Sequence, residues 1–134
     1  MRHFLRCLAL VLGLATAGCQ AQNVSTGVVN MDVGVEDFAA GLSNSNEVLL
    51  LDVRTDKEFM EGHLMGATQL DFFRDDFKTE VEKLDRTRPV YVYCRSGNRS
   101  GKAAKLMKEL GFAEVYNLEG GFGAWLSAGK AIAK

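Results

Sequence analysis

Apolar residues recur along the chain in short runs, and stretches with helical periodicity lie between these runs. Residues 48–53 (Val-Leu-Leu-Leu-Asp-Val) form a continuous apolar run, and residues 90–93 (Val-Tyr-Val-Tyr) are β-branched and aromatic. Both runs predict strands that are covered on two faces, as in a parallel sheet. Shorter runs near residues 28–31 and 115–118 predict two further strands.

The clearest helical pattern covers residues 99–110, where Ala103, Met107 and Leu110 share one face and Gly111 follows the end. Other helices are predicted at residues 35–42, 56–61, 73–84 and 121–128. Strands that alternate with helices predict an α/β fold, an open parallel sheet with helices on both faces. We expect one such domain over residues 28–132, with its ligand site beyond the carboxyl ends of the strands.

The segment before this domain has the pattern of an export signal. Arg2 and Arg6 precede an apolar run at residues 8–17, which is too short to remain as a membrane-spanning helix. We therefore expect residues 1–18 to be a signal peptide and the polar residues 19–27 to be a tether.

Two kinds of signal cleavage fit the residues around Cys19. Thr16-Ala17-Gly18-Cys19 resembles a bacterial lipobox, although Thr16 stands where leucine is usual. In that case Cys19 is lipidated and becomes the new N-terminus, and the protein is periplasmic and anchored to the outer membrane. The alternative is ordinary cleavage after Ala15-Thr16-Ala17, which would release a soluble periplasmic protein.

Composition narrows the chemistry that the domain can use. The net charge of the 134 residues is −1 with no basic stripe, which argues against nucleic acid as a partner. Two histidines and three scattered cysteines do not form a zinc-binding pattern, so we expect no metal and no cofactor. Once Cys7 and Cys19 are assigned to the signal region, Cys94 is the one thiol left in the domain.

The loop that follows residues 90–93 carries the candidate chemistry. Cys94 ends a buried strand, Gly97 and Asn98 permit a tight turn, and a helix starts a few residues later. Inward N–H groups, the helix N-terminus and the two arginines Arg95 and Arg99 would favour a thiolate. A buried structural cysteine is the alternative, but packing alone has no use for two arginines in this loop. We therefore expect a nucleophilic Cys94 and a covalent intermediate.

Several segments match one known family in order and spacing. They are Leu51-Asp-Val-Arg54, Glu58-Phe59, Glu61-Gly62-His63-Leu64, Gly66-Ala67, Tyr93-Cys-Arg-Ser-Gly-Asn-Arg-Ser100 and Leu118-Glu-Gly-Gly-Phe122 with Trp125. On these segments the chain resembles the single-domain rhodaneses over nearly the whole predicted mature length, and Met65 departs from the proline usual in the family. Export makes it similar to the periplasmic phage-shock-type forms, to which the lipobox would be an addition.

This resemblance implies a sulfurtransferase in which Cys94 carries sulfane sulfur as a persulfide. The donor would be a small anion such as thiosulfate, and the acceptor would be cyanide or a thiol. Arg95 and Arg99 stand where the family's loop residues contact the anionic donor. The predicted substrate-binding loop is Arg95, Ser96, Gly97, Asn98, Arg99 and Ser100.

Three further residues are supporting candidates. Asp52 and Arg54 end a central strand, where we expect a buried or half-buried ion pair that holds the turn and that Glu58 could join. Arg54 could instead act on the donor electrostatically. His63 is a possible proton donor, but we expect its ring to bond to the backbone of the Gly62–Gly66 turn.

Two rival functions use a similar loop. Cysteine phosphatases have five residues between cysteine and arginine, whereas Cys94 and Arg99 are separated by four, which favours a smaller cradle. The second rival is a persulfide carrier or sulfur-sensing module without turnover. The sequence does not separate such a carrier from an enzyme, because both need the same loop.

Overall fold

Five parallel strands form one open sheet in the computed structural model, which describes residues 27–134. The strand order is β1-β5-β4-β2-β3, so the central strand β4 leads directly to Cys94. The predicted signal peptide, Cys19 and residues 20–26 of the tether lie outside the described residues. The strands are β1 (Val29–Val33), β2 (Leu49–Asp52), β3 (Thr68–Gln69), β4 (Val90–Tyr93) and β5 (Glu114–Leu118).

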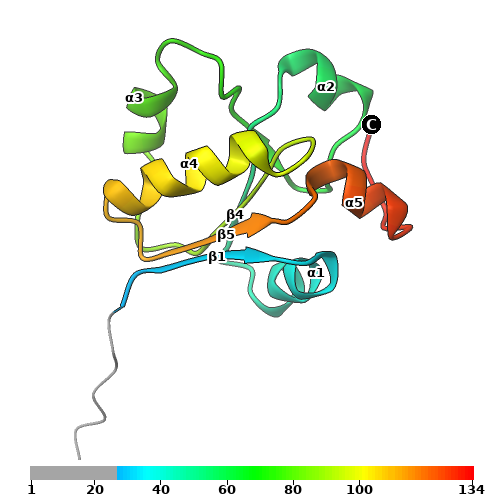
Figure 1. The fold of residues 1–134 in the computed structure, drawn as a ribbon, viewed down its shortest axis with the longest axis horizontal. Coiled ribbons are helices and arrows are strands. Elements are labelled where there is room, and N and C mark those ends of the chain that lie inside the picture. Colours follow the sequence, from blue (N-terminus) through cyan, green and yellow to red (C-terminus); the bar gives the residue numbers. More distant parts are fainter. Residues whose placement is uncertain (1–26) are drawn as a thin grey trace, which may run out of the picture.

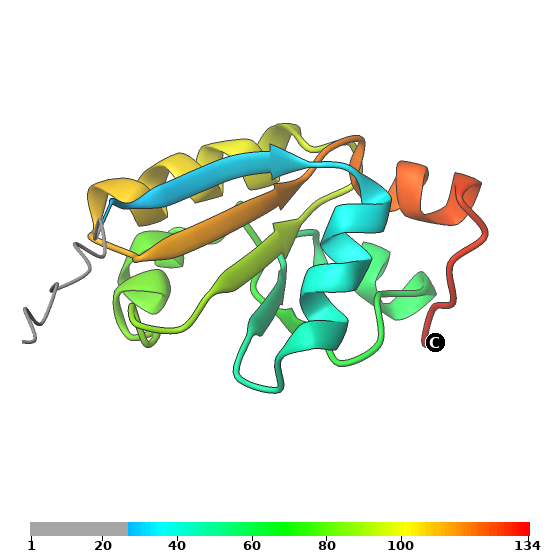
Figure 2. The same ribbon diagram turned by 90° about the horizontal axis from the view of Figure 1, so that it is seen from below.

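Helices cover both faces of this sheet (Figures 1 and 2). On one face α3 and α4 pack against the sheet, and on the other face α1 and α5 do so. The short helix α2 follows β2 at the carboxyl edge. The predicted open parallel α/β fold is thus confirmed. The helices are α1 (Val35–Asn44), α2 (Asp56–Glu61), α3 (Phe77–Glu82), α4 (Asn98–Glu109) and α5 (Gly121–Ser127).

The alternation of side chains along β4 explains why this strand is apolar throughout. Val92 and Cys94 point into the core beneath α3 and α4, whereas Tyr91 and Tyr93 belong to the core beneath α1 and α5. Successive strand residues face opposite sides of a sheet, so a strand with helices on both sides needs apolar residues at every position. Cys94 therefore enters the site from the α4 side.

Two elements differ from the sequence-based expectation. The edge strand β3 was not predicted, because a two-residue strand carries no periodicity. The helix expected over residues 73–84 is limited to α3. At its expected start, Asp71 Oδ1 accepts a hydrogen bond of 2.9 Å from the Phe73 amide, which holds a turn instead. Aspartate side chains that bond to nearby amides compete with helix formation, and this stretch contains several of them.

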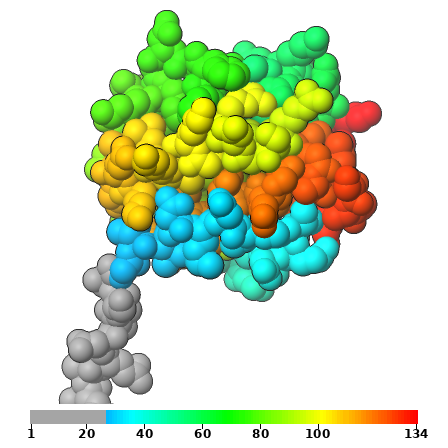
Figure 3. Space-filling model, in the orientation of Figure 1, coloured from blue at the N-terminus to red at the C-terminus, as the bar shows by residue number. Residues whose placement is uncertain are grey.

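The opposite edge of the sheet is formed by β1, which lies on the surface beside α4 (Figure 3). Its burial pattern is mixed, and Met31 is exposed. Among residues 27–134 there is no helix with the length and apolar character needed to cross a membrane.

Candidate active site

Cys94 lies at the end of β4, immediately before the tight loop that leads to α4. Gly97 is the residue before the helix and has φ +96°, a left-handed conformation that favours glycine. This turn reverses the chain within three residues, so the first amides of α4 come back toward the cysteine. The side chain of Cys94 is fully buried.

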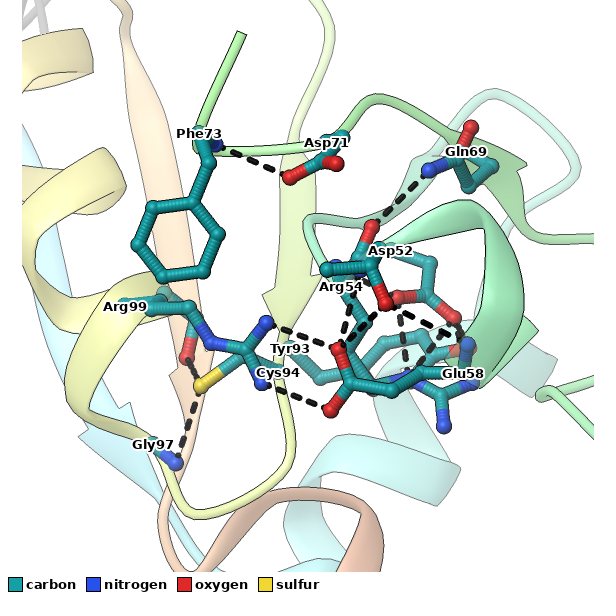
Figure 4. Close-up of polar contacts among 12 residues, drawn as sticks. Asp52, Arg54, Glu58, Gln69, Asp71, Phe73, Tyr93, Cys94, Gly97 and Arg99 are labelled. Carbon is teal, nitrogen blue, oxygen red and sulfur yellow. Dashed lines mark hydrogen bonds and ion pairs between the residues drawn. The ribbon is translucent and has the colours of Figure 1, made fainter.

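The loop presents hydrogen-bond donors to the Cys94 sulfur. The Gly97 amide donates to Sγ at 3.2 Å (Figure 4). The buried Ser100 hydroxyl donates to Sγ at 3.3 Å. Donors from a turn and from the first residues of a helix stabilise an anion at this point. The Ser100 hydroxyl therefore bonds to the Cys94 sulfur.

The electrostatic surroundings of Cys94 favour the thiolate. Burial acts to raise the pKa of this thiol, but hydrogen bonds from the Ser100 hydroxyl and from the amides of Ser100, Ser96 and Gly97 outweigh it. The net effect lowers the pKa of Cys94 below its ordinary value. A thiolate is the nucleophilic form of cysteine, so the loop prepares Cys94 for attack on an electrophile.

Arg99 and Glu58 form an ion pair beside the sulfur. Arg99 Nη1 and Nη2 donate to Glu58 Oε2 and Oε1, each at 2.8 Å. The Arg99 side chain runs past the Cys94 sulfur toward Glu58, and its guanidinium lies 5.5 Å from the centre of the Phe73 ring (Figure 4). The hydrogen bonds from Arg99, followed by those from Thr55, lower the pKa of Glu58 to about 2 despite partial burial.

A second pair lies deeper. Arg54 Nη2 bonds to Asp52 Oδ2 and to the Gly62 carbonyl, each at 2.7 Å, and both side chains of the pair are buried. The Tyr93 hydroxyl also donates to Asp52. The expected buried ion pair that holds the turn is therefore confirmed, but Glu58 is not part of it.

The remaining predicted residues lie around these two pairs. His63 Nδ1 lies 3.0 Å from the Phe59 carbonyl, so its ring bonds to the backbone of α2 and not, as was expected, to that of the Gly62–Gly66 turn. Arg95, Ser96 and Asn98 are exposed in the loop. Arg95 lines a cleft of about 510 Å³ beside the site, together with Arg54, Glu58, Glu61, Phe122, Gly123, Leu126, Ile132 and Lys134.

Sequence reasoning gave no role to Gly120 and Gly121 at the start of α5, although Gly121 supports the loop. Gly121 has φ +59°, and a Cβ atom there would lie 2.5 Å from the Cys94 carbonyl oxygen. The next amides, of Phe122 and Gly123, donate to the carbonyls of Cys94 and Arg95 at 2.8 and 3.1 Å. Two consecutive glycines after a strand are the signal that points to such a close backbone approach.

Asn117 on β5 is a second residue that the sequence did not single out. Its Nδ2 donates to Asp32 Oδ1 at 2.9 Å and to the Gly97 carbonyl at 3.3 Å. It thus links the edge strand β1 to the turn whose amide faces the sulfur. A lone asparagine in an apolar strand is the available signal, because a buried amide needs partners.

The site residues that the structure describes do not form a metal centre. No group of three His, Cys, Asp or Glu side chains within residues 27–134 is arranged to hold an ion.

Comparison with known proteins places this site in a family. The model of the rhodanese-like domain family matches residues 34–128. The chain belongs to the rhodanese-like family. YqhL of Bacillus subtilis is 38% identical over 99 residues, which cover 74% of this chain and 73% of that protein. The thiosulfate sulfurtransferase GlpE of Shewanella oneidensis is 34% identical over 87 residues, covering 65% and 84% of the two chains.

Solved structures give the same result for the rhodanese-like fold. The rhodanese-like domain of the Anabaena protein Alr3790 superposes with a TM-score of 0.67 at 26% identity, and the match covers 76% of this chain and 77% of that one. A rhodanese-like domain protein from Staphylococcus aureus gives a TM-score of 0.62 at 26% identity, over 70% and 89% of the two chains. The family match and the relatives named thiosulfate sulfurtransferase together support a sulfurtransferase family.

Proposed function

We propose that this rhodanese-like protein is a sulfurtransferase that carries sulfane sulfur as a persulfide on Cys94. The observation that supports this best is the pair of donors, the Gly97 amide and the Ser100 hydroxyl, that point at the Cys94 sulfur. The same donors that stabilise a thiolate suit the terminal sulfur of a persulfide, which also carries negative charge.

The reaction consists of two displacements at sulfur. The Cys94 thiolate attacks the sulfane sulfur of thiosulfate, a new S–S bond forms, and the bond to the sulfonate sulfur breaks to release sulfite. An acceptor such as cyanide then attacks the terminal sulfur of the persulfide, and thiocyanate leaves as the Cys94 thiolate is restored. Charge balances in both steps, and the covalent intermediate predicts ping-pong kinetics.

The donor is proposed to be a small anion because the loop itself carries two arginines. Arg95 is exposed next to Cys94, and Arg99 lies beside the sulfur. The proposal disfavours phosphatase activity, since the four residues between Cys94 and Arg99 make a shorter loop than the five of cysteine phosphatases.

The test is formation of thiocyanate from thiosulfate and cyanide by the mature protein, with intact mass measured after thiosulfate alone. We expect turnover and a mass gain of one sulfur, and both should be lost in Cys94→Ser. Mass gain without turnover would support the alternative, a persulfide carrier or sulfur-sensing module. If the protein showed no mass gain and no turnover, both functions would be contradicted.

We also propose that the protein acts in the periplasm, attached to the outer membrane through lipid on Cys19. The support is the sequence pattern around Cys19. The wild-type protein should partition into detergent, whereas Cys19→Ala should be soluble or unprocessed. Equal partitioning of both proteins would contradict lipidation and leave the soluble periplasmic alternative.

A further inference from the structure

We propose that Glu58 is a specificity-determining residue. Its carboxylate masks the Arg99 guanidinium, and an anionic donor must replace this carboxylate on Arg99 before it reaches Cys94. This inference rests on the proposed function, in which the donor is an anion. It assigns to Glu58 a role in selecting reagents by charge, beyond its contact with Arg99.

The first observation is how fully the pair engages Arg99. Both terminal nitrogens of Arg99 donate to the two oxygens of Glu58 at 2.8 Å, which is the bidentate arrangement that an oxyanion would otherwise use. A second anion cannot take the same edge of the guanidinium while Glu58 occupies it.

The second observation is where Glu58 lies. Its side chain lines the 510 Å³ cleft that also contains Arg95 and Lys134, and it faces Arg99 on the other side. Cys94 itself is fully buried, and the Arg99 side chain runs past its sulfur (Figure 4). Glu61 also lines this cleft, so an anion that Arg95 and Lys134 attract meets two carboxylates there, of which Glu58 is the one paired with Arg99.

The third observation identifies which partner can move. Glu58 Oε2 also accepts hydrogen bonds from the Thr55 amide and hydroxyl, each at 3.0 Å, in the capping box of α2. Arg99 is a long side chain at the start of α4, and it rests against Phe73, which is 67% exposed. Glu58 is held by its own helix, so release of the pair requires movement of Arg99.

The cost of that movement is modest because the pair is only partly buried. The side chains of Arg99 and Glu58 are 18% and 23% exposed. Ion pairs with access to solvent contribute little to stability, and an incoming dianion can replace the lost contact. A neutral reagent cannot replace the contact that Arg99 would lose, and it reaches Cys94 without binding the guanidinium.

The test compares alkylation of Cys94 by iodoacetate, an anion, with alkylation by iodoacetamide, its neutral analogue. In each reaction an S–C bond forms and iodide leaves, so the ratio of the two rates reports the charge selectivity at the sulfur. In Glu58→Gln we expect this ratio to rise about two- to fivefold. Glutamine can retain the capping box, so the helix should be preserved.

The matched control is Glu80→Gln. Glu80 forms an ion pair with Lys83 at 2.6 Å on α3, outside the site, and the substitution changes the net charge by the same amount. Its ratio should equal that of the wild type. A rise of equal size in Glu80→Gln would show that only the overall charge matters, and it would overturn the proposal.

The double variant Glu58→Gln, Arg99→Gln separates masking from simple repulsion. If Glu58 acts by occupying Arg99, the double variant should have the same ratio of iodoacetate to iodoacetamide rates as Arg99→Gln alone. Two results would overturn the proposal: a ratio in Glu58→Gln equal to that of the wild type, or a rise from Arg99→Gln to the double variant as large as the rise from the wild type to Glu58→Gln. Alkylation does not require sulfur transfer, so failure of the thiocyanate assay would not affect this readout.

Discussion

Two arginine–carboxylate pairs lie at the same edge of the sheet, and they differ in how firmly they are held. The Asp52–Arg54 pair is sealed, with the two side chains 0% and 3% exposed. The Glu58–Arg99 pair reaches solvent, at 23% and 18%. The first pair forms the floor of the site and the second its rim.

The partners of each pair explain this difference. Around the floor pair, the Arg54 amide and the Tyr93 hydroxyl bond to Asp52, and Arg54 bonds to the Gly62 carbonyl. Separation of that pair would leave a buried charge without a partner, which is among the costliest defects in a protein. The rim pair can exchange partners with water or with an anion. The comparison thus assigns stability to the floor and selectivity to the rim.

The largest expected effect comes from removing the charge at the floor. Asp52→Asn leaves the buried Arg54 guanidinium without its counter-ion, and we expect a loss of about 3–5 kcal/mol in the free energy of unfolding. Urea denaturation curves, monitored by circular dichroism, measure this loss.

The control for that variant is Asp76→Asn, which breaks a pair that is bidentate but exposed, Arg74–Asp76. Its urea midpoint should hardly change, because solvent replaces the lost contact. Similar midpoints for Asp52→Asn and Asp76→Asn would break the distinction between a sealed pair and an open one.

The second prediction tests the backbone support of the Cys94 loop. Gly121→Ala combines a strained φ of +59° with a Cβ atom 2.5 Å from the Cys94 carbonyl oxygen. Gly129→Ala has a similar φ of +69° but no atom within 4 Å, so it measures the strain alone, about 1 kcal/mol. We expect Gly121→Ala to lose at least about twice as much, and to change the iodoacetamide rate of Cys94 as the loop shifts. Equal effects of the two substitutions would show that the close approach is relieved without cost.

The floor was largely predictable from sequence, and the rim was not. The apolar runs located β2 and β4 within a residue or two, because a strand buried on both faces must be apolar at each position. The Asp52–Arg54 pair followed from the rule that buried charges are paired. Both arguments use residues that are close in sequence.

The pair of Glu58 with Arg99 joins positions 41 residues apart, on α2 and α4. Its formation depends on how two helices meet at the sheet edge, and no local pattern encodes that. The contact of Asn117 with the Gly97 carbonyl is likewise set by the neighbouring positions of β5 and β4. Long-range polar contacts were therefore the part of the site that only the three-dimensional structure supplied.

The smallest of these stability effects concerns the rim. The pKa of Glu58 is lowered in the folded protein from its ordinary value of 4.5 to about 2, chiefly by the hydrogen bonds from Arg99. A carboxylate whose folded pKa is depressed adds stability above its unfolded pKa, and that stability is lost as the pH falls toward the folded value. Glu58→Gln should therefore be less stable than the wild type at pH 7, by about 1–2 kcal/mol after allowance for exposure.

The dependence on pH is what separates charge from packing in this variant. The difference between wild type and Glu58→Gln should shrink between pH 4.5 and pH 2, as the wild-type carboxylate takes up its proton. Urea midpoints measured at several pH values in this window give the curve. A difference that stays constant down to pH 2 would mean that the carboxylate stabilises the rim through shape and not through charge. In that case glutamine would mask Arg99 as well as glutamate does, and the contrast between a sealed floor and an exchangeable rim would lose its electrostatic basis.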